Sequence, residues 1–296
     1  MNPLFIGSCA ALVTPLHEDQ TINFDQFAKC IEDQIANKTS AVVVCGTTGE
    51  GATLSLEERA KLFAFAVHEV RGRVPVICGT GSNSTSLCLE TAKLAEACGA
   101  DAHLIVTPYY NKTSQAGLIA HYKTLADALT KPIILYNVPS RTGMNIQPET
   151  YRALAKHKNI VAVKEADPDI AKLTRAIALC GDDLTFYSGN DDLAVAACTL
   201  GCKGTISVLA NLFPAYSHEM NTAAIEGDNE KAAAMQKDAM PLIDALFCTV
   251  NPMPVKYAMT RCGIPVGPCR LPLTEPGTKE KAAIDAALEA FQSCLK

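Results

Sequence analysis

The segment Asn159-Ile160-Val161-Ala162-Val163-Lys164 shows the pattern from which the fold of this 296-residue chain can be predicted. It is a short apolar run with β-branched residues, typical of a buried strand, and its cation stands at the carboxyl end. A lysine amine has an ordinary pKa of about 10.4 and is therefore protonated at neutral pH. Burial at a strand end favours the neutral, nucleophilic amine. Alternatively, Lys164 could cap the strand and extend into solvent.

Seven further apolar runs of this kind lie along the chain. The eight candidate strands cover residues 8–13, 41–45, 74–78, 102–106, 133–136, 160–163, 184–187 and 204–208. Helical patterns separate them, for example over residues 24–35, 56–70, 84–98 and 191–200. Ser55, with Glu58 three residues later, predicts a capping box, and Asn190-Asp191 predicts another helix start.

The ends of successive candidate strands are 18 to 33 residues apart, a nearly regular strand–helix period. Eight such units predict an α/β fold, a (β/α)8 TIM barrel, which we expect to form a catalytic domain over residues 1–226. Residues 227–296 are expected to form a C-terminal helical extension. A doubly wound open sheet is the rival fold, but no GxGxxG motif follows the first strand.

The composition argues against several classes of partner. The chain is 48% apolar and carries a net charge of -5, so it lacks the basic surface that nucleic-acid binding requires. No run of 18 apolar residues is present, so no membrane-spanning segment is predicted. The 13 cysteines include no CxxC pair, and the six histidines form no HxH or HExxH motif. We therefore expect no metal and no other cofactor.

The cysteine content also bears on the cellular compartment. The number of cysteines is odd, and the apolar stretch near the amino terminus has no Lys or Arg before it, unlike a secretory signal. Reduced thiols and a cytoplasmic location are therefore expected.

Polar residues cluster where several predicted strands end. Gly46-Thr47-Thr48-Gly49-Glu50 follows the second strand, Tyr109-Tyr110-Asn111 follows the fourth, and Tyr136-Asn137-Val138-Pro139-Ser140-Arg141 follows the fifth. In a TIM barrel these ends share one face, where the active site lies. Each residue has a structural alternative: Tyr136 could be a core tyrosine, Arg141 a surface ion-pair residue and Glu50 a structural partner inside the rim.

This set of side chains suits carbonyl condensation through a Schiff base. A neutral lysine can attack a 2-oxo acid, and the resulting iminium accepts electrons when a methyl proton leaves. A tyrosine hydroxyl can transfer protons, and threonine hydroxyls with turn amides can hold a carboxylate. An arginine can grip a second carboxylate with two hydrogen bonds.

Five motifs in order, GTTGE, TPYYN, YNVPSRTG, VAVKEA and YSGND, resemble those of the pyruvate-dependent class I aldolase superfamily. The resemblance covers essentially the whole chain. It implies condensation of pyruvate with L-aspartate 4-semialdehyde to give 4-hydroxy-tetrahydrodipicolinate, a step of lysine and diaminopimelate biosynthesis. It also implies a homotetramer built from two tight dimers.

The resemblance assigns expected roles to single residues. Lys164 would form the Schiff base, Tyr136 would transfer protons, and Thr47 would link Tyr136 to Tyr110 of a neighbouring subunit. For the substrates, Thr48 would bind the carboxylate of pyruvate and Arg141 that of L-aspartate 4-semialdehyde. Gly189 and Ile206 would line the site through their backbone.

Two alternatives and one departure from the family pattern remain. Another pyruvate-dependent lyase, acting on sialic acid or a sugar acid, would share the lysine and tyrosine but generally lacks an arginine at position 141. A non-catalytic ligand-binding barrel would be expected to lose parts of the relay. Where lysine-inhibited members carry a glutamate and histidines, this chain has Leu87, Leu56 and Arg59. A bound lysine ammonium would lack its main charge partner, so little or no lysine feedback is predicted.

Overall fold

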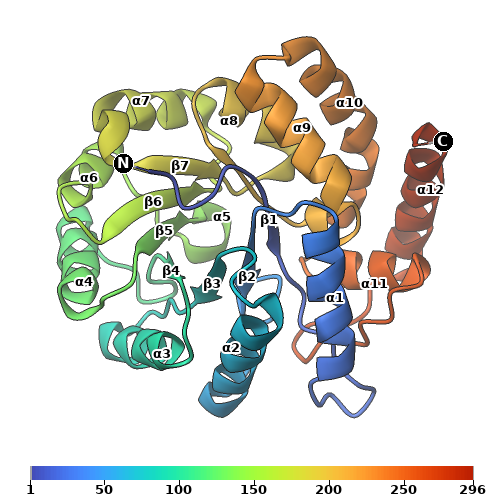
Figure 1. The fold of residues 1–296 in the computed structure, drawn as a ribbon, viewed down its shortest axis with the longest axis horizontal. Coiled ribbons are helices and arrows are strands. Elements are labelled where there is room, and N and C mark those ends of the chain that lie inside the picture. Colours follow the sequence, from blue (N-terminus) through green and yellow to red (C-terminus); the bar gives the residue numbers. More distant parts are fainter. Residues whose placement is uncertain (1, 296) are drawn as a thin grey trace.

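The eight apolar runs form parallel strands that close into one barrel, with β1 to β8 following each other in chain order (Figure 1). This computed structural model describes residues 2–295. The strands are β1 (Gly7–Ala11), β2 (Ala41–Val44), β3 (Val76–Gly79), β4 (Ala102–Val106), β5 (Ile133–Asn137), β6 (Ile160–Glu165), β7 (Thr185–Ser188) and β8 (Gly204–Ser207). The predicted (β/α)8 barrel is therefore confirmed.

Most of the helices surround the barrel on its outer side, and one short helix, over residues 139–142, lies at the end of β5 instead (Figure 1). They are α1 (Phe24–Ala36), α2 (Leu56–Val70), α3 (Thr85–Ala97), α4 (Gln115–Ala128), α5 (Pro139–Thr142), α6 (Pro148–Leu154), α7 (Ile170–Cys180), α8 (Ala194–Thr199), α9 (Pro214–Glu226), α10 (Asn229–Leu246), α11 (Met253–Arg261) and α12 (Thr278–Cys294). Three short 3-10 helices are η1 (Gly181–Asp183), η2 (Asp191–Leu193) and η3 (Leu209–Asn211). No helix among residues 2–295 is both long and apolar enough to cross a bilayer.

Helical segments begin at both predicted starts, but only one of the two has a side-chain cap. Ser55 and Glu58 form the predicted capping box of α2, with each side chain accepting a hydrogen bond from the other's backbone amide. A helical segment does begin at Asp191, as the 3-10 helix η2 that continues into α8, but Asn190 makes no side-chain capping bond. The Asp191 carboxylate instead accepts hydrogen bonds from the amides of Val208 and Leu209, after β8.

Alternate residues of each strand face the barrel interior or the helices. On β6, Ala162 belongs to the apolar cluster that fills the barrel, whereas Val163 belongs to the cluster beneath the helices. Continuing this alternation, Lys164 faces inward and Glu165 outward. Glu165 accepts hydrogen bonds from the Tyr151 hydroxyl at 2.7 Å and from the Asn137 amide at 2.7 Å.

A register shift between β5 and β6 decides which residues stand side by side. Ile133 pairs with Ile160, but Ile134 pairs with Ala162, so Val161 is left over as a bulge. From there on, Tyr136 pairs with Lys164. Without the extra residue, Tyr136 would lie opposite an outward-facing position. The bulge therefore brings the tyrosine and the lysine together inside the barrel.

The C-terminal helices α10, α11 and α12 pack on one side of the barrel, with α12 at the outer edge (Figure 1). Their apolar side chains, such as Leu242, Val255 and Leu288, share a cluster with Val13 and Leu209 of the barrel. Helix α9 ends at Glu226, and the division of the chain between residues 226 and 227 stays a prediction.

A buried ion pair joins these C-terminal helices to the rim of the barrel. Lys256 of α11 lies 2.8 Å from Glu50, and their side chains are only 3% and 1% exposed. Lys256 also donates to the carbonyls of Thr14 and Pro268, and Glu50 accepts a hydrogen bond from the backbone amide of Arg270. All three Lys256 donors thus have partners, which offsets the cost of removing both charges from water.

We predict that Lys256→Met lowers the free energy of unfolding by about 3 to 5 kcal/mol, because it leaves the Glu50 carboxylate buried without its cation. Chemical denaturation monitored by circular dichroism measures the change. The double variant Glu50→Gln/Lys256→Met should recover part of the loss, since no unpaired charge then remains.

The exposed pair Glu57–Lys61 provides the control. Lys61→Met should change the free energy of unfolding by less than about 1 kcal/mol, as expected for a solvated pair. A loss of similar size in both single variants would contradict the structural role assigned to the buried pair.

Candidate active site

Lys164 and Tyr136 lie together at the inner wall of the barrel, where β5 and β6 end. Their residues are 6% and 7% exposed. The Lys164 Nζ stands 4.5 Å from the centre of the Tyr136 ring, within the range of a cation–π contact. The alternative that Lys164 extends into bulk solvent as a strand cap is therefore wrong.

A cavity of about 180 Å³ opens above this pair. Its polar lining consists of Thr47, Thr48, Tyr136, Ser140, Arg141, Lys164, Asn190 and Asn251. Its apolar lining consists of Ala11, Val43, Leu104, Val138, Ala166, Val208 and Phe247, with Gly46 and Gly189. A cavity of this size suits a small molecule of a few heavy atoms, and the side chains around it could bind a carbonyl and a carboxylate.

Gly189, after β7, allows the chain to pass close to the lysine. A Cβ atom at this position would lie 3.1 Å from Lys164 Cε and 2.8 Å from Ala166 Cβ. Its amide donates a 2.6 Å hydrogen bond to the Glu165 carbonyl, which ties the end of β7 to that of β6. A side chain here would therefore push against the amine-bearing arm of Lys164.

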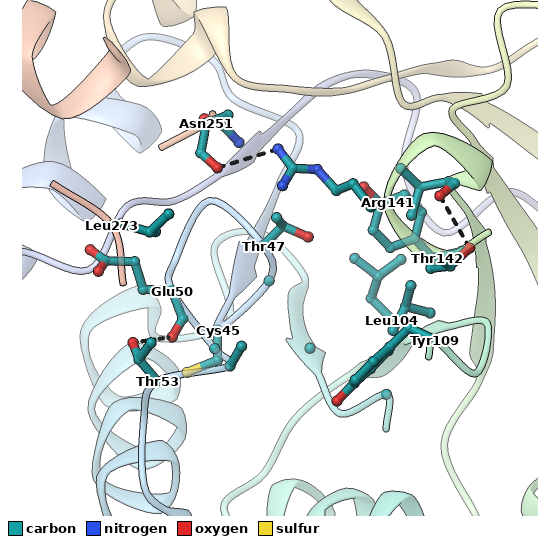
Figure 2. A pocket seen from close by; sticks show the side chains of 18 of the residues that line it. Cys45, Thr47, Glu50, Thr53, Leu104, Tyr109, Arg141, Thr142, Asn251 and Leu273 are labelled. Atoms are coloured by element: carbon teal, nitrogen blue, oxygen red, sulfur yellow. Dashed lines mark hydrogen bonds between the residues drawn. The ribbon is translucent and has the colours of Figure 1, made fainter. Parts of the chain in front are cut away.

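Arg141 lies in α5 and extends across the mouth of the cavity toward Asn251 (Figure 2). Its Nη2 donates to the Asn251 carbonyl at 3.3 Å. The Asn251 side chain donates to the Thr48 hydroxyl at 3.0 Å, so the residue connects both predicted carboxylate-binding positions. Asn251 Oδ1 is buried and has no hydrogen-bond partner among the described residues.

A second cavity, of about 350 Å³, lies beside the first and is shown in Figure 2. Thr47, Leu104, Tyr136, Arg141 and Asn251 line both cavities. The two spaces therefore adjoin, with the inner one at Lys164 and the outer one leading away from it.

Two of the predicted site residues lie outside both cavities. Ile206 is 1% exposed and packs in the barrel interior, and Val208 rather than Ile206 lines the inner cavity. Tyr110 is 92% exposed, with a positive φ of 68°, and does not line the cavity of its own chain. The other predicted residues, Lys164, Tyr136, Thr47, Thr48, Arg141 and Gly189, all line the inner cavity.

Sequence reasoning missed Asn251 as a site residue. It lies 203 positions after Thr48 in the chain, in the loop between α10 and α11, which no strand-end pattern places at the barrel mouth. Its only sequence signal was its place in the segment Asn251-Pro252-Met253-Pro254-Val255-Lys256, which resembles the family. Glu50 is the opposite case, because it lies on the rim but is bound to Lys256 and has a structural role.

The carboxylate behind the lysine strand is also structural. Glu165 is buried, and desolvation raises its pKa, while the nearby Lys172 ammonium and the hydrogen bonds from Tyr151 and Asn137 act in the opposite direction. Asn137 in turn accepts a hydrogen bond from the amide of Ile146 at 3.0 Å. This network fixes the outer faces of β5 and β6 and so supports the inner pair.

The three residues on which the feedback prediction depends lie near the outer cavity or on the surface. Arg59 lines the outer cavity and donates to the Gly51 carbonyl. Leu87 is 46% exposed, and Leu56 begins α2. The expected weakness of lysine inhibition stays a prediction.

Known proteins share this architecture over the full chain. A solved dihydrodipicolinate synthase from Acinetobacter baumannii, described as chloride inhibited and complexed with pyruvate, is 39% identical with a TM-score of 0.95, covering 97% of this chain and 99% of that one. A second solved synthase, described as the first monomeric variant, is 38% identical with a TM-score of 0.95, covering 98% and 97%.

Sequence relatives give the same result. The 4-hydroxy-tetrahydrodipicolinate synthase of Thermoanaerobacter sp. (strain X514) is 47% identical over 290 residues, which is 98% of this chain and 97% of the relative. The model of the dihydrodipicolinate synthetase family matches residues 4–291. The family resemblance drawn from the five motifs is confirmed, and the chain belongs to the dihydrodipicolinate synthetase family.

Proposed function

We propose that the chain catalyses the condensation of pyruvate with L-aspartate 4-semialdehyde to give 4-hydroxy-tetrahydrodipicolinate, as a step of lysine and diaminopimelate biosynthesis. The observation that carries this proposal is the buried pair of Lys164 and Tyr136 beneath a small cavity that also contains Thr48 and Arg141. Membership of the family and the activity named for its relatives support it.

In the first step the neutral Lys164 amine adds to the C2 carbonyl of pyruvate, and water leaves to give an iminium. The cation draws electrons from the methyl group, so a methyl proton can leave and an enamine forms. The enamine carbon then attacks the aldehyde of the second substrate, forming the new carbon–carbon bond. The pyruvate bound in the Acinetobacter relative supports a pyruvate site in this fold.

Proton transfer is assigned to Tyr136, because its ring lies beside the Lys164 amine. Thr47 lies in the same cavity wall and could connect this hydroxyl to Tyr110 of a neighbouring subunit. The exposed position of Tyr110, away from its own cavity, is what such an exchange between subunits requires. General acid–base catalysis of this kind contributes about 10²- to 10⁴-fold to rate.

The two substrate carboxylates are assigned to different ends of the inner cavity. Thr48, which is buried and bonded to Asn251, would hold the carboxylate of pyruvate. Arg141, at the mouth, would hold that of L-aspartate 4-semialdehyde. Arg141 therefore favours this substrate over the sialic-acid or sugar-acid substrates of the alternative lyases.

The working assembly is proposed to be a homotetramer made of two tight dimers. Each tight dimer would exchange Tyr110 between its two sites. One similar solved synthase is described as a monomeric variant, which is consistent with oligomers elsewhere in the family.

Incubation with pyruvate and borohydride should trap a pyruvate adduct on Lys164, detected by peptide mass spectrometry. Lys164→Ala should yield no adduct, because no other lysine lines the inner cavity among the described residues. Lys172→Arg is the control, since Lys172 is also a buried lysine but is bound to Asp167, outside the barrel interior. An adduct at another residue of the wild-type protein, or none, would end the proposed mechanism.

Arg141→Ala should lower kcat/KM for L-aspartate 4-semialdehyde by roughly 10- to 150-fold, equivalent to about 1.5 to 3 kcal/mol for a hydrogen bond to a charged group. Pyruvate trapping at Lys164 should change little, because that step does not use the guanidinium. A coupled assay with both substrates measures the loss. Equal losses in trapping and condensation, or turnover of a sialic acid by the wild type, would favour the alternative lyases.

Mixing two inactive variants tests the exchange of Tyr110. Tyr110→Phe and Lys164→Ala subunits, dissociated and reassociated together, should regain roughly a quarter of wild-type activity, because half of random dimers are hybrids with one complete site each. Native mass spectrometry confirms the hybrids. Hybrids without recovered activity, or a fully active monomer in sedimentation, would contradict the shared site.

A further inference from the structure

The Thr48 hydroxyl lines the inner cavity and has a donor proton that no described residue accepts. It is buried, and among the residues that the structure describes its one hydrogen bond comes from the side-chain amide of Asn251, at 3.0 Å. A hydroxyl has one donor proton and separate acceptor lone pairs, so this bond leaves the proton available. Two nearby threonines differ, because Thr14 and Thr53 each donate their proton to a backbone carbonyl of the loop that contains Thr48.

Stability alone does not explain the amide of Asn251. The residue is 5% exposed, and its Oδ1 has no hydrogen-bond partner among residues 2–295. A buried acceptor without a partner destabilises the folded protein, so its presence indicates another role. The remaining polar groups of Asn251 contact the two proposed carboxylate-binding residues: the side-chain amide donates to Thr48, and the backbone carbonyl accepts from Arg141 at 3.3 Å.

A second contact fixes Asn251 relative to Thr48. Glu50, two residues after Thr48, forms the buried 2.8 Å ion pair with Lys256, which follows Asn251 by five residues. The loop after β2 and the segment that leads into α11 are therefore joined at two neighbouring points. Because the ion pair restrains both segments, the amide is held against the hydroxyl before a ligand enters the cavity.

We propose that Asn251 is a positioning residue that directs the Thr48 proton toward the carboxylate of pyruvate. This inference rests on the proposed function, in which Thr48 holds that carboxylate. The amide fills an acceptor position of the hydroxyl and so leaves the donor proton for the ligand. A hydroxyl that accepts one hydrogen bond while it donates another is polarised by the first, which strengthens the second. Asn251 thus acts on pyruvate through Thr48.

The test is a double-mutant cycle on the pyruvate concentration that gives a half-maximal initial rate of trapping by cyanoborohydride at Lys164. Thr48→Val should raise this concentration by roughly 10- to 150-fold, as expected for a lost hydrogen bond to a charged group. Asn251→Ala keeps the hydroxyl but not its direction, so we expect a rise of roughly 3- to 10-fold. In the Thr48→Val background, Asn251→Ala should add less than about 2-fold, since no hydroxyl remains to be directed.

Two further measurements separate positioning from a general loosening of the site. At saturating pyruvate, the half-saturating concentration of L-aspartate 4-semialdehyde should change by less than about 2-fold in Asn251→Ala, because the backbone carbonyl that binds Arg141 remains. Thr249→Ala, in the same loop but outside both cavities, should leave pyruvate trapping unchanged. Additive losses in the cycle, or an equal rise for both substrates, would overturn the proposal.

The variant Asn251→Asp tests whether donation by the amide is what matters. Aspartate has nearly the same size, but its carboxylate can only accept, so it draws the Thr48 proton away from the ligand. Pyruvate trapping should therefore weaken more than in Asn251→Ala, and part of this extra loss should disappear in the Thr48→Val background. If circular dichroism shows that Asn251→Ala does not fold, Asn251→Asp takes its place in the cycle. Trapping as in the wild type by folded Asn251→Asp would contradict the role of the amide.

Failure of the proposed function itself would look different, since the wild type would then form no pyruvate adduct at Lys164. An adduct that forms at the same pyruvate concentrations in wild type and Asn251→Ala would leave the function intact and remove the positioning role.

Discussion

The pairing of β5 with β6 is the constraint on which the rest of the site depends. A lysine amine acts as a nucleophile most readily where water is largely excluded. The closed barrel provides such an environment at the carboxyl ends of its strands. The single unpaired residue Val161 sets which side chain of β5 stands beside Lys164. The result is a tyrosine ring 4.5 Å from the amine, with a cavity above both.

Around this pair, the molecule separates its polar groups by role. Groups that face inward, such as Thr48 and Arg141, line the cavity and can bind a ligand. Glu165, on the outer face, instead accepts hydrogen bonds from Asn137 and Tyr151 that hold the strands together. Asp191 also has a structural role, because its carboxylate accepts hydrogen bonds from the backbone amides of Val208 and Leu209. The alternation of side chains along each strand thus places ligand-binding groups inside the barrel and structural groups on its outer face.

Much of the fold could be predicted from sequence because its signals are local. The strand–helix period depends on short apolar runs and helical patterns, and six of the eight expected site residues line one cavity because strand ends in a barrel converge. The features that the sequence did not predict depend on contacts between segments far apart in the chain. No glycine or proline marks the bulge at Val161, Asn251 reaches the site from the α10–α11 loop, and Asp191 binds amides beyond β8 instead of capping its own helix.

The ion pair between Glu50 and Lys256 makes the segment after α9 more than an appendage. Glu50 belongs to the same loop as Thr47 and Thr48, and Lys256 follows Asn251 by five residues. The loop that offers hydroxyls to the ligand is therefore anchored by the last quarter of the chain. A recombinant protein that joined this barrel to the carboxyl-terminal segment of another protein would keep Lys164 but lose the ion pair that anchors the loop of Thr47 and Thr48. Exchange of the carboxyl-terminal segment between proteins is therefore limited by the needs of the active site as well as by packing.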